Sequence, residues 1–186
     1  MALKARKVVV LGYPGVGKSA VTTQYVEGQV PPGYSVTVAH ANYRKTVHVR
    51  GQDYDLEILD TAGQYETSNL DPVYGLGVDG YIFVFSINSH ASFNTIKTIN
   101  EKVLNLWGTS TVPVVLVGNK VDLDQQFRQV SPEEAREQSM KWGCPFVECS
   151  ATKNLNVEVI FDKLIEQIEK SSSAGAIPSK ESCVLL

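Results

Sequence analysis

The sequence predicts an α/β fold in three layers, in which helices cover both faces of a mostly parallel, six-stranded sheet. Short apolar runs recur at residues 8–11, 81–85 and 112–117, and each resembles a strand that is buried on both faces. Segments with helical spacing separate these runs, so strands and helices alternate along the chain. A pair of strands at 43–49 and 54–59 adds one antiparallel edge strand to the sheet.

The first strand, at 6–11, leads through a glycine-containing loop into a helix predicted at about 18–27. Gly28 follows that helix directly, and glycine is the residue that most often ends a helix. Residues 29–35 contain two prolines and a glycine, which predict an exposed, irregular loop. The strand pair that follows reads as a hairpin with one solvated face, because apolar and acidic side chains alternate along its second strand.

The second half of the chain continues the same alternation. Pro72 interrupts any long helix between Asp60 and Gly77, and a fully apolar strand follows. Ser89 or Ser92 can cap the next helix, which ends near Trp107. The last predicted elements are a strand at 112–117, a helix that begins at Ser131-Pro132, a strand at 145–149 and a helix at about 155–170.

Composition is typical of a soluble protein with one domain. Of the 186 residues, 43% are hydrophobic and 20% are charged, and the net charge of −3 gives no basic field for nucleic acid. No apolar stretch approaches the ~20 residues of a membrane span or forms a signal-peptide core. The three cysteines and three histidines show no metal-ligand or redox spacing, which suits a reducing cytosol. We predict one domain at 1–170 and a flexible tail at 171–186.

The first motif is a phosphate-binding loop, G-x-x-x-x-G-K-S, between the first strand and the first helix. Gly15 and Gly17 have no Cβ, so the backbone N–H groups can approach a polyphosphate closely. Lys18 can reach the β- and γ-phosphates, and the Ser19 hydroxyl is placed to hold Mg²⁺. The alternative is a glycine-rich turn without a ligand, but the strand, the spacing and the following helix all favour phosphate binding.

The second motif follows the strand at 54–59 and reads Asp60-Thr61-Ala62-Gly63-Gln64. The carboxyl ends of strands are where α/β folds bind ligands. Asp60 can hold Mg²⁺ there, directly or through water, and Gly63 lets the backbone approach a γ-phosphate. Gln64 can orient an attacking water. Read alone, Asp60 could simply cap a turn and Gln64 could be a surface residue.

The third motif, Asn119-Lys120-Val121-Asp122, follows the strand at 112–117. The Asp122 carboxylate can accept two hydrogen bonds from the N1–H and amino group of guanine. Adenine lacks this pair of donors and would leave the carboxylate unpaired, so the acid selects guanine. Ser150-Ala151-Thr152 follows the last strand and would supply a backbone N–H to the guanine carbonyl. Each motif follows a strand, and their order strengthens the interpretation.

With these motifs, residues 6 to 170 resemble a Ras-superfamily small GTPase, and within it the Ras family and its Rheb branch. Gly12-Tyr13, residues 24–29 and Gly51-Gln52-Asp53-Tyr54 favour that branch. The resemblance implies the Ras-like phosphate-loop GTPase fold and a monomer that switches between GDP-bound and GTP-bound states with Mg²⁺. It also implies effectors, an exchange factor and an activating protein that contact switch loops at about 30–43 and 61–77.

The resemblance also assigns residues to roles. Lys18 and Gln64 would be catalytic, and Ser19, Thr37 and Asp60 would hold the metal. The nucleotide would be bound by Gly15, Val16, Gly17, Lys18, Ser19, Ala20, Val30, Tyr34, Thr37, Gly63, Asn119, Lys120, Asp122, Ser150, Ala151 and Thr152.

Four departures from the family pattern are expected to matter. Pro14 should crowd the position that an incoming arginine finger would occupy. Val30 replaces an aromatic side chain beside the guanine and predicts faster nucleotide exchange, which equal GDP release by a Val30→Phe variant would contradict. Residues 35–42 have one additional residue and lack the usual acidic and proline positions, which makes Ras-type effectors unsuitable and weakens the transfer of Rheb effectors such as the TOR kinase complex. Thr152 replaces the usual lysine, whose alkyl stem packs on the base.

The chain ends Cys183-Val184-Leu185-Leu186, a C-a-a-X pattern whose final leucine favours geranylgeranylation of Cys183. An accidental cysteine in the tail is the alternative. One lipid with little basic charge nearby gives reversible membrane binding. We therefore expect a cytoplasmic protein that cycles to the cytoplasmic face of a membrane.

Two further function classes compete with a hydrolysing switch. The first is a GTP-binding scaffold with negligible hydrolysis, regulated by nucleotide exchange, and Pro14, Val30 and the altered segment at 35–42 favour it. Gln64 argues against it. The second is a small-molecule kinase on the same loop, which the Asn119–Asp122 motif and the absence of an obvious lid segment disfavour.

Overall fold

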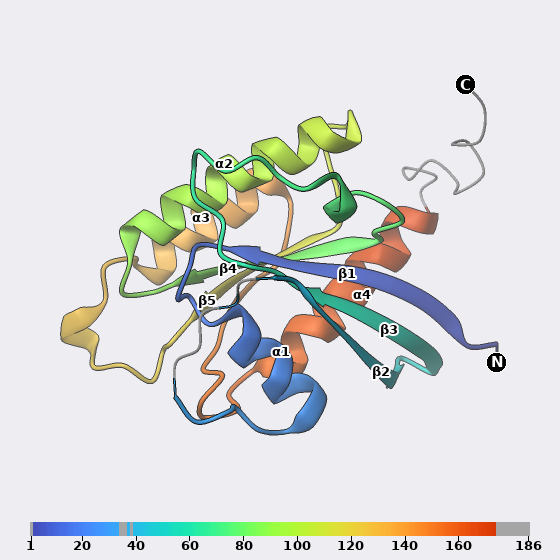
Figure 1. Ribbon diagram of the computed structural model, residues 1–186, viewed down its shortest axis with the longest axis horizontal. Helices are drawn as coiled ribbons and strands as arrows, with labels where there is room; N and C mark the ends of the chain where they lie inside the picture. Colours follow the sequence, from blue (N-terminus) through green and yellow to red (C-terminus); the bar gives the residue numbers. More distant parts are fainter. Residues whose placement is uncertain (1, 34–36, 38, 174–186) are drawn as a thin grey trace.

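The computed structural model describes residues 2–33, 37 and 39–173, and they form one six-stranded sheet with helices on both faces (Figure 1). The strand order is β2-β3-β1-β4-β5-β6, and the strands are joined in parallel except for the β2–β3 pair at one edge. The strands are β1 (Lys4–Gly12), β2 (Ala41–Val49), β3 (Gln52–Asp60), β4 (Gly80–Ser86), β5 (Val114–Asn119) and β6 (Phe146–Glu148). The predicted fold class, including its antiparallel edge strand, is confirmed.

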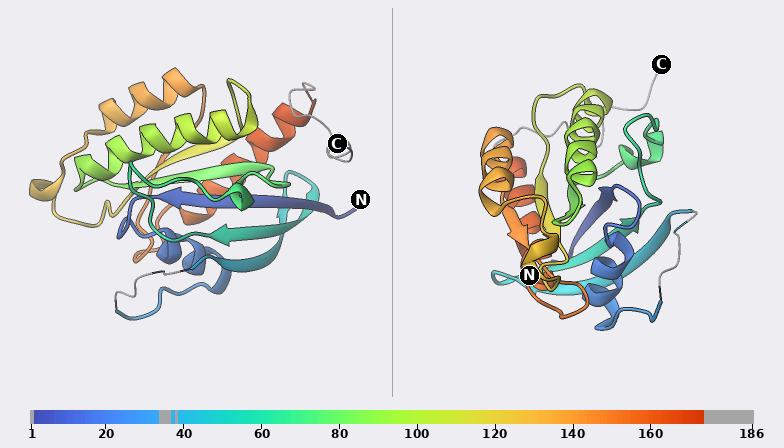
Figure 2. Two further views of the ribbon diagram at one scale, coloured as in Figure 1. Left: turned by 45° about the horizontal axis from the view of Figure 1, so that its top comes forward. Right: turned by 90° about the vertical axis from the view of Figure 1, so that its left-hand side faces the viewer.

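The described residues form four α-helices and two short 3₁₀ turns, and all of them except the last helix lie between strands. The helices are α1 (Lys18–Glu27), α2 (His90–Trp107), α3 (Pro132–Trp142) and α4 (Val157–Ser173), and the turns are η1 (Pro72–Tyr74) and η2 (Gln125–Phe127). Helices α1 and α4 pack on one face of the sheet, and α2 and α3 pack on the other (Figure 2). In the layer formed by α1 and α4, Tyr25 of α1 stacks face to face on Phe161 of α4.

Local signals account for most element ends. Gly28 has a φ of 73° and ends α1, where a left-handed residue is easiest for glycine. The Ser89 side chain accepts a hydrogen bond from the Ser92 backbone N–H, so Ser89 is the cap of α2. The hairpin turns at Arg50 and Gly51, whose φ values of 50° and 81° are those of a two-residue turn between antiparallel strands. Among the described residues, no helix is long and apolar enough to cross a bilayer.

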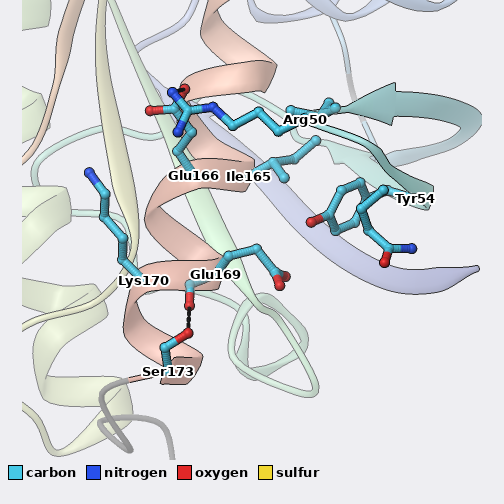
Figure 3. A pocket seen from close by; sticks show the side chains of 9 residues that line it. Arg50, Tyr54, Ile165, Glu166, Glu169, Lys170 and Ser173 are labelled. Atoms are coloured by element: carbon cyan, nitrogen blue, oxygen red, sulfur yellow. Dashed lines mark hydrogen bonds and ion pairs between the residues drawn. The ribbon is translucent and has the colours of Figure 1, made fainter. Parts of the chain in front are cut away.

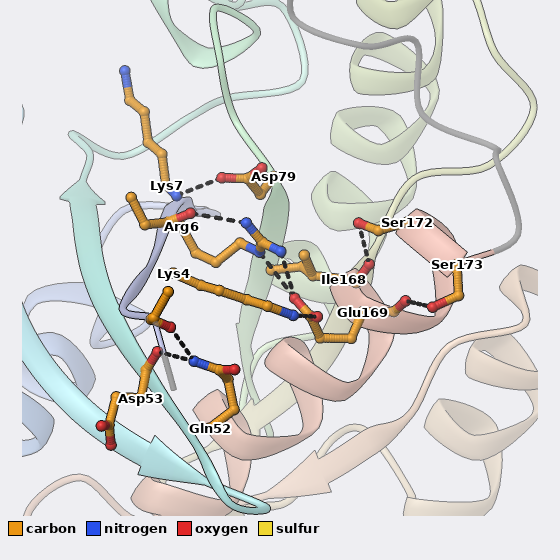
Figure 4. Close-up of polar contacts among 12 residues, drawn as sticks. Lys4, Arg6, Lys7, Gln52, Asp53, Asp79, Ile168, Glu169, Ser172 and Ser173 are labelled. Atoms are coloured by element: carbon orange, nitrogen blue, oxygen red, sulfur yellow. Dashed lines mark hydrogen bonds and ion pairs between the residues drawn. The ribbon is translucent and has the colours of Figure 1, made fainter.

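The last helix extends beyond its predicted end at residue 170, so residues 171–173 are helical and not part of a flexible tail. The Ser172 and Ser173 hydroxyls donate to carbonyl oxygens one turn earlier, at 2.9 and 2.8 Å. The side chains of Lys4 and Arg6 in β1 pair with Glu169 and hold this last turn against the sheet (Figure 4). The helix therefore ends at Ser173, three residues beyond its predicted end.

Candidate nucleotide and metal site

The three sequence motifs meet at the carboxyl ends of β1, β3 and β5, as expected for a parallel sheet with ligands at that edge. A cleft of about 290 Å³ opens there. Its walls are the loop after β1, the first turn of α1, parts of the segment before β2 and the end of β3. The predicted residues that line it are Gly15, Gly17, Lys18, Ser19, Ala20, Val30, Thr37, Asp60 and Gly63.

The phosphate loop has the backbone geometry that glycine permits. Gly15 and Gly17 have φ values of 74° and 96°, in the left-handed region. A Cβ on Gly17 would lie 2.3 Å from Nδ2 of Asn119, so a side chain there would displace a buried amide. Helix α1 begins at Lys18, and its first N–H groups are free of helical partners and favour an anion.

Lys18 is a buried cation in this cleft. Its side chain is 5% exposed, and Nζ donates to the carbonyl oxygens of Gly12 at 3.1 Å and Tyr13 at 3.2 Å. Burial lowers the pKa of Lys18 to about 8, although the nearby Asp60 carboxylate opposes this shift. A negatively charged ligand would supply the compensation that two neutral carbonyls do not supply.

Ser19, Thr37 and Asp60 converge from three separate segments. The Ser19 hydroxyl lies 2.9 Å from Oγ1 of Thr37 and donates to Oδ2 of Asp60. The other carboxylate oxygen, Oδ1, is buried and has no hydrogen-bond partner among the described residues. Burial raises the pKa of Asp60, against the opposing effects of the Ser19 hydrogen bond and Lys18. Hydroxyl and carboxylate oxygens beside an unpartnered oxygen fit a hard divalent cation such as Mg²⁺.

Gln64 lies next to this cleft but does not line it. Its side chain is 7% exposed, its Nε2 donates to the Ala62 carbonyl at 3.1 Å, and it is not among the residues that line the cleft. Its backbone N–H donates to the Gly12 carbonyl at 3.0 Å, which keeps residue 64 beside the phosphate loop. A catalytic role therefore requires the Gln64 side chain to rotate.

Pro14 and Gly63 lie side by side in the wall of the cleft. A Cβ built on Gly63 would lie 2.3 Å from Cγ and 2.6 Å from Cα of Pro14, so the two residues pack as closely as their backbones allow. The neighbouring rings of Tyr13 and Tyr65 also meet edge to face, with centroids 5.3 Å apart. The phosphate loop and the segment after β3 are thus in direct contact.

Asn119 and Lys120 attach the third motif to the phosphate loop. Asn119 is buried, and its Nδ2 donates to the Val16 carbonyl at 2.9 Å while its Oδ1 accepts from the Ala151 N–H at 3.2 Å. Lys120 has a φ of 74°, and its Nζ donates to the Gly15 carbonyl at 2.8 Å. These bonds place the loops after β5 and β6 beside the phosphate loop.

Asp122 receives hydroxyl donors on both carboxylate oxygens, a feature that sequence reasoning missed. Ser150 donates to Oδ1 at 2.6 Å, and the Thr152 hydroxyl lies 3.2 Å from Oδ2. Burial would raise the pKa of Asp122, but the hydroxyl donors and the charge of Lys153 leave it below its usual value. The carboxylate is therefore held ionised, as an acceptor.

The predicted site residues thus form two groups. Those named above line the cleft, whereas Asn119, Lys120, Asp122, Ser150, Ala151 and Thr152 form a second cluster that hydrogen bonds connect to it. Val16 is buried and contributes its carbonyl. Tyr34 and Cys183 lie outside the described residues. Pro14 also lines the cleft. Five further lining residues were not predicted as binding residues, because no motif marks them: Thr23, Pro31, Gly33, Ala41 and Tyr43.

A larger groove, of about 580 Å³, lies at the opposite end of the sheet between the β2–β3 turn and α4 (Figure 3). Several charged side chains of this groove are already in ion pairs. Arg50 pairs with Glu166 at 2.7 Å, and Glu169 pairs with Lys4 and Arg6 (Figure 4). None of the three motifs reaches it. The smaller cleft is lined by residues of the first two motifs, and hydrogen bonds connect the third motif to it, so it is the candidate site.

Comparison with known proteins identifies the family of the chain. The sequence model of the Ras family matches residues 7–170. The chain is 42% identical over 183 residues to the "GTP-binding protein Rheb homolog" of Dictyostelium discoideum, with 98% of each chain covered. It is 40% identical to the "GTP-binding protein rhb1" of Schizosaccharomyces pombe and to the "GTP-binding protein Rheb" of Homo sapiens, again with 98% of each chain covered.

Proposed function

The chain belongs to the Ras family as a Rheb-like small GTPase, which binds guanine nucleotide and hydrolyses GTP to GDP, and from this premise we propose how its residues do so. The polyphosphate occupies the cleft above α1, and guanine lies against Asn119 and Asp122. The observation that best supports this placement is the buried Lys18, whose ammonium donates to two neutral carbonyl oxygens and has no hydrogen bond to an anionic group among the described residues. The Ala151 N–H donates to Oδ1 of Asn119 in the free protein, so it has to exchange this partner to donate to the guanine carbonyl.

Mg²⁺ is held by Ser19, Thr37 and Asp60 in this proposal. The support is the unpartnered, buried Oδ1 of Asp60 beside two hydroxyl groups that converge from other segments. An ion bound by these residues would supply positive charge that offsets the charge of the phosphates. Lys18 adds a second positive charge, and the N–H groups of the phosphate loop and of Gly63 orient the γ-phosphate.

Gln64 is proposed to position the attacking water after its side chain leaves the Ala62 carbonyl and turns into the cleft. The test is single-turnover hydrolysis of bound GTP by wild type and Gln64→Leu, with GDP release measured in parallel. We expect the variant to hydrolyse about 10- to 1,000-fold more slowly at an unchanged GDP release rate, as for loss of a group that acts in the transition state. Equal hydrolysis in both proteins would exclude this role for Gln64.

The alternative of a scaffold with negligible hydrolysis receives no support from the relatives, which are GTPases of the same family. The same experiment separates the two. Retained nucleotide with no hydrolysis in wild type would favour the scaffold.

Nucleotide binding should take up protons at alkaline pH. The free protein holds Lys18 with a pKa of about 8, and the phosphates should raise that pKa on binding. Well below pH 8, Lys18 is protonated in both the free and the nucleotide-bound protein. At about pH 9 the free protein holds mostly the neutral amine, which binding protonates, so affinity falls as pH rises through this range. Calorimetry of GDP binding in buffers of different ionisation enthalpy measures the uptake, which should vanish at pH 7. Proton release at pH 9 would contradict the assignment.

We further propose that effectors, an exchange factor and an activating protein bind the switch loops at about 30–43 and 61–77. An arginine finger should enter poorly, because Pro14 packs against Gly63 at the wall of the γ-phosphate region. A finger contributes roughly 10³ to 10⁵ in rate where it is used. We expect Pro14→Gly to raise activator-stimulated hydrolysis by at least about tenfold over stimulated wild type. No added response of the variant to an arginine-supplying activator would contradict this prediction.

Membrane attachment through a geranylgeranylated Cys183 remains a proposal that rests on the C-terminal sequence pattern. With one lipid, the protein would exchange between the cytoplasm and the cytoplasmic face of a membrane. Fractionation of cells that express wild type or Cys183→Ser tests it, and an unchanged membrane fraction in the variant would exclude it.

A further inference from the structure

Asp122 is an exposed side chain held at both of its oxygens by a single turn. Ser150 is fully buried, and its hydroxyl donates to Oδ1 at 2.6 Å. Thr152, two residues along the same turn, places Oγ1 at 3.2 Å from Oδ2. An exposed aspartate without such donors would be free to rotate, so these two contacts restrict its orientation.

The number of hydroxyl protons on Ser150 and Thr152 decides to which oxygen Thr152 donates. Ser150 has one hydroxyl proton, which it gives to Asp122, and it accepts from the Lys153 backbone N–H at 3.1 Å. Thr152 also has one proton, and two acceptors are within reach: Oδ2 of Asp122 and Oγ of Ser150, which is 3.1 Å away. A charged acceptor forms the stronger bond, so the Thr152 proton goes to the carboxylate.

The turn that presents Thr152 is itself fixed. The Ser150 and Leu155 backbones exchange two hydrogen bonds, at 2.9 and 3.1 Å, and close the loop between them. Ala151 is buried and donates its N–H to Oδ1 of Asn119. Threonine is branched at Cβ and has few side-chain rotamers. The position of the Thr152 hydroxyl is therefore fixed before any ligand binds.

We infer that Thr152 is a positioning residue for guanine recognition, whose hydroxyl holds Oδ2 of Asp122 in the orientation that accepts from the base. Each carboxylate oxygen has a second lone pair, so the hydroxyl and a base donor can bind the same oxygen together. An acceptor that is already oriented loses less entropy on binding. The inference rests on the proposed function, in which Asp122 recognises guanine.

The test is a double-mutant cycle on GDP affinity, measured with Mg²⁺. Thr152→Val removes the hydroxyl at nearly constant shape, and we expect it to weaken GDP binding about three- to tenfold, as for one hydrogen bond to a charged group. Thr152→Ser is the matched control and should retain most of the affinity. In an Asp122→Ala background, Thr152→Val should have no further effect, because the carboxylate that it orients is gone.

The outcomes separate the inference from its premise. If Asp122→Ala leaves GDP affinity unchanged, the proposed guanine site itself is wrong. If Asp122→Ala weakens binding but Thr152→Val weakens it equally in both backgrounds, or not at all, Thr152 has no positioning role.

A second readout is the fall of GDP affinity at acidic pH, the acid limb of the binding profile, measured in the single variants at residue 152. The loss of a donor to the charged carboxylate should move this limb to higher pH in Thr152→Val but not in Thr152→Ser. An unmoved limb in Thr152→Val would overturn the inference.

Discussion

Replacing Lys18 with methionine should weaken GDP and GTP binding by roughly 30- to 5,000-fold, the range for removing one partner of a buried, hydrogen-bonded charge pair. Methionine preserves most of the alkyl stem and removes only the charge and its hydrogen bonds to the Gly12 and Tyr13 carbonyls. Equilibrium binding of a fluorescent GDP analogue measures the loss. A decrease of less than about fivefold would show that Lys18 does not contact the phosphates.

The same substitution should not destabilise the nucleotide-free protein. The Lys18 pKa of about 8 lies below the usual value for lysine, because burial disfavours the charged form. The charged Lys18 side chain therefore destabilises the free protein. We expect the melting temperature without nucleotide to be equal to or higher than that of wild type. Lys141→Met, at an exposed position in the last turn of α3, is the control and should alter neither affinity nor stability. Loss of both binding and stability in Lys18→Met would indicate misfolding.

Replacing Phe161 with alanine should cost about 3–5 kcal/mol in the free energy of unfolding, the range for a fully buried phenylalanine. Phe161 is 1% exposed in α4 and stacks on Tyr25 of α1 with ring centroids 3.6 Å apart and planes within 6°. Alanine at 161 leaves a cavity between the two helices of one layer. Urea denaturation monitored by circular dichroism measures the difference.

Phe127 is the matched control for that experiment. It lies in η2 and is 56% exposed, so Phe127→Ala should change the free energy of unfolding by less than about 0.5 kcal/mol. A cost of less than about 1.5 kcal/mol for Phe161→Ala would mean that α1 and α4 close over the space. Similar costs at the two positions would contradict the assignment of Phe161 to the core.

Most of the fold could be predicted because its signals are local. Buried parallel strands are continuously apolar, and a proline, a serine cap or a glycine marks where helices begin and end. The start of α3 after Ser131 and the end of α1 at Gly28 followed from such residues. The last turn of α4 did not, because serine is a weak helix former and three successive serines give no local signal of a helix.

For the site, the order and spacing of the motifs determined which residues should meet, because each motif follows a strand of a parallel sheet and such strands end at one edge. Only the tertiary structure decided how their side chains lie. It turned Gln64 toward Ala62, packed Pro14 on Gly63 and brought Thr152 to Asp122. These contacts join segments that approach one another only after the sheet and its loops have packed, and side-chain orientation depends on that packing more than on sequence neighbours.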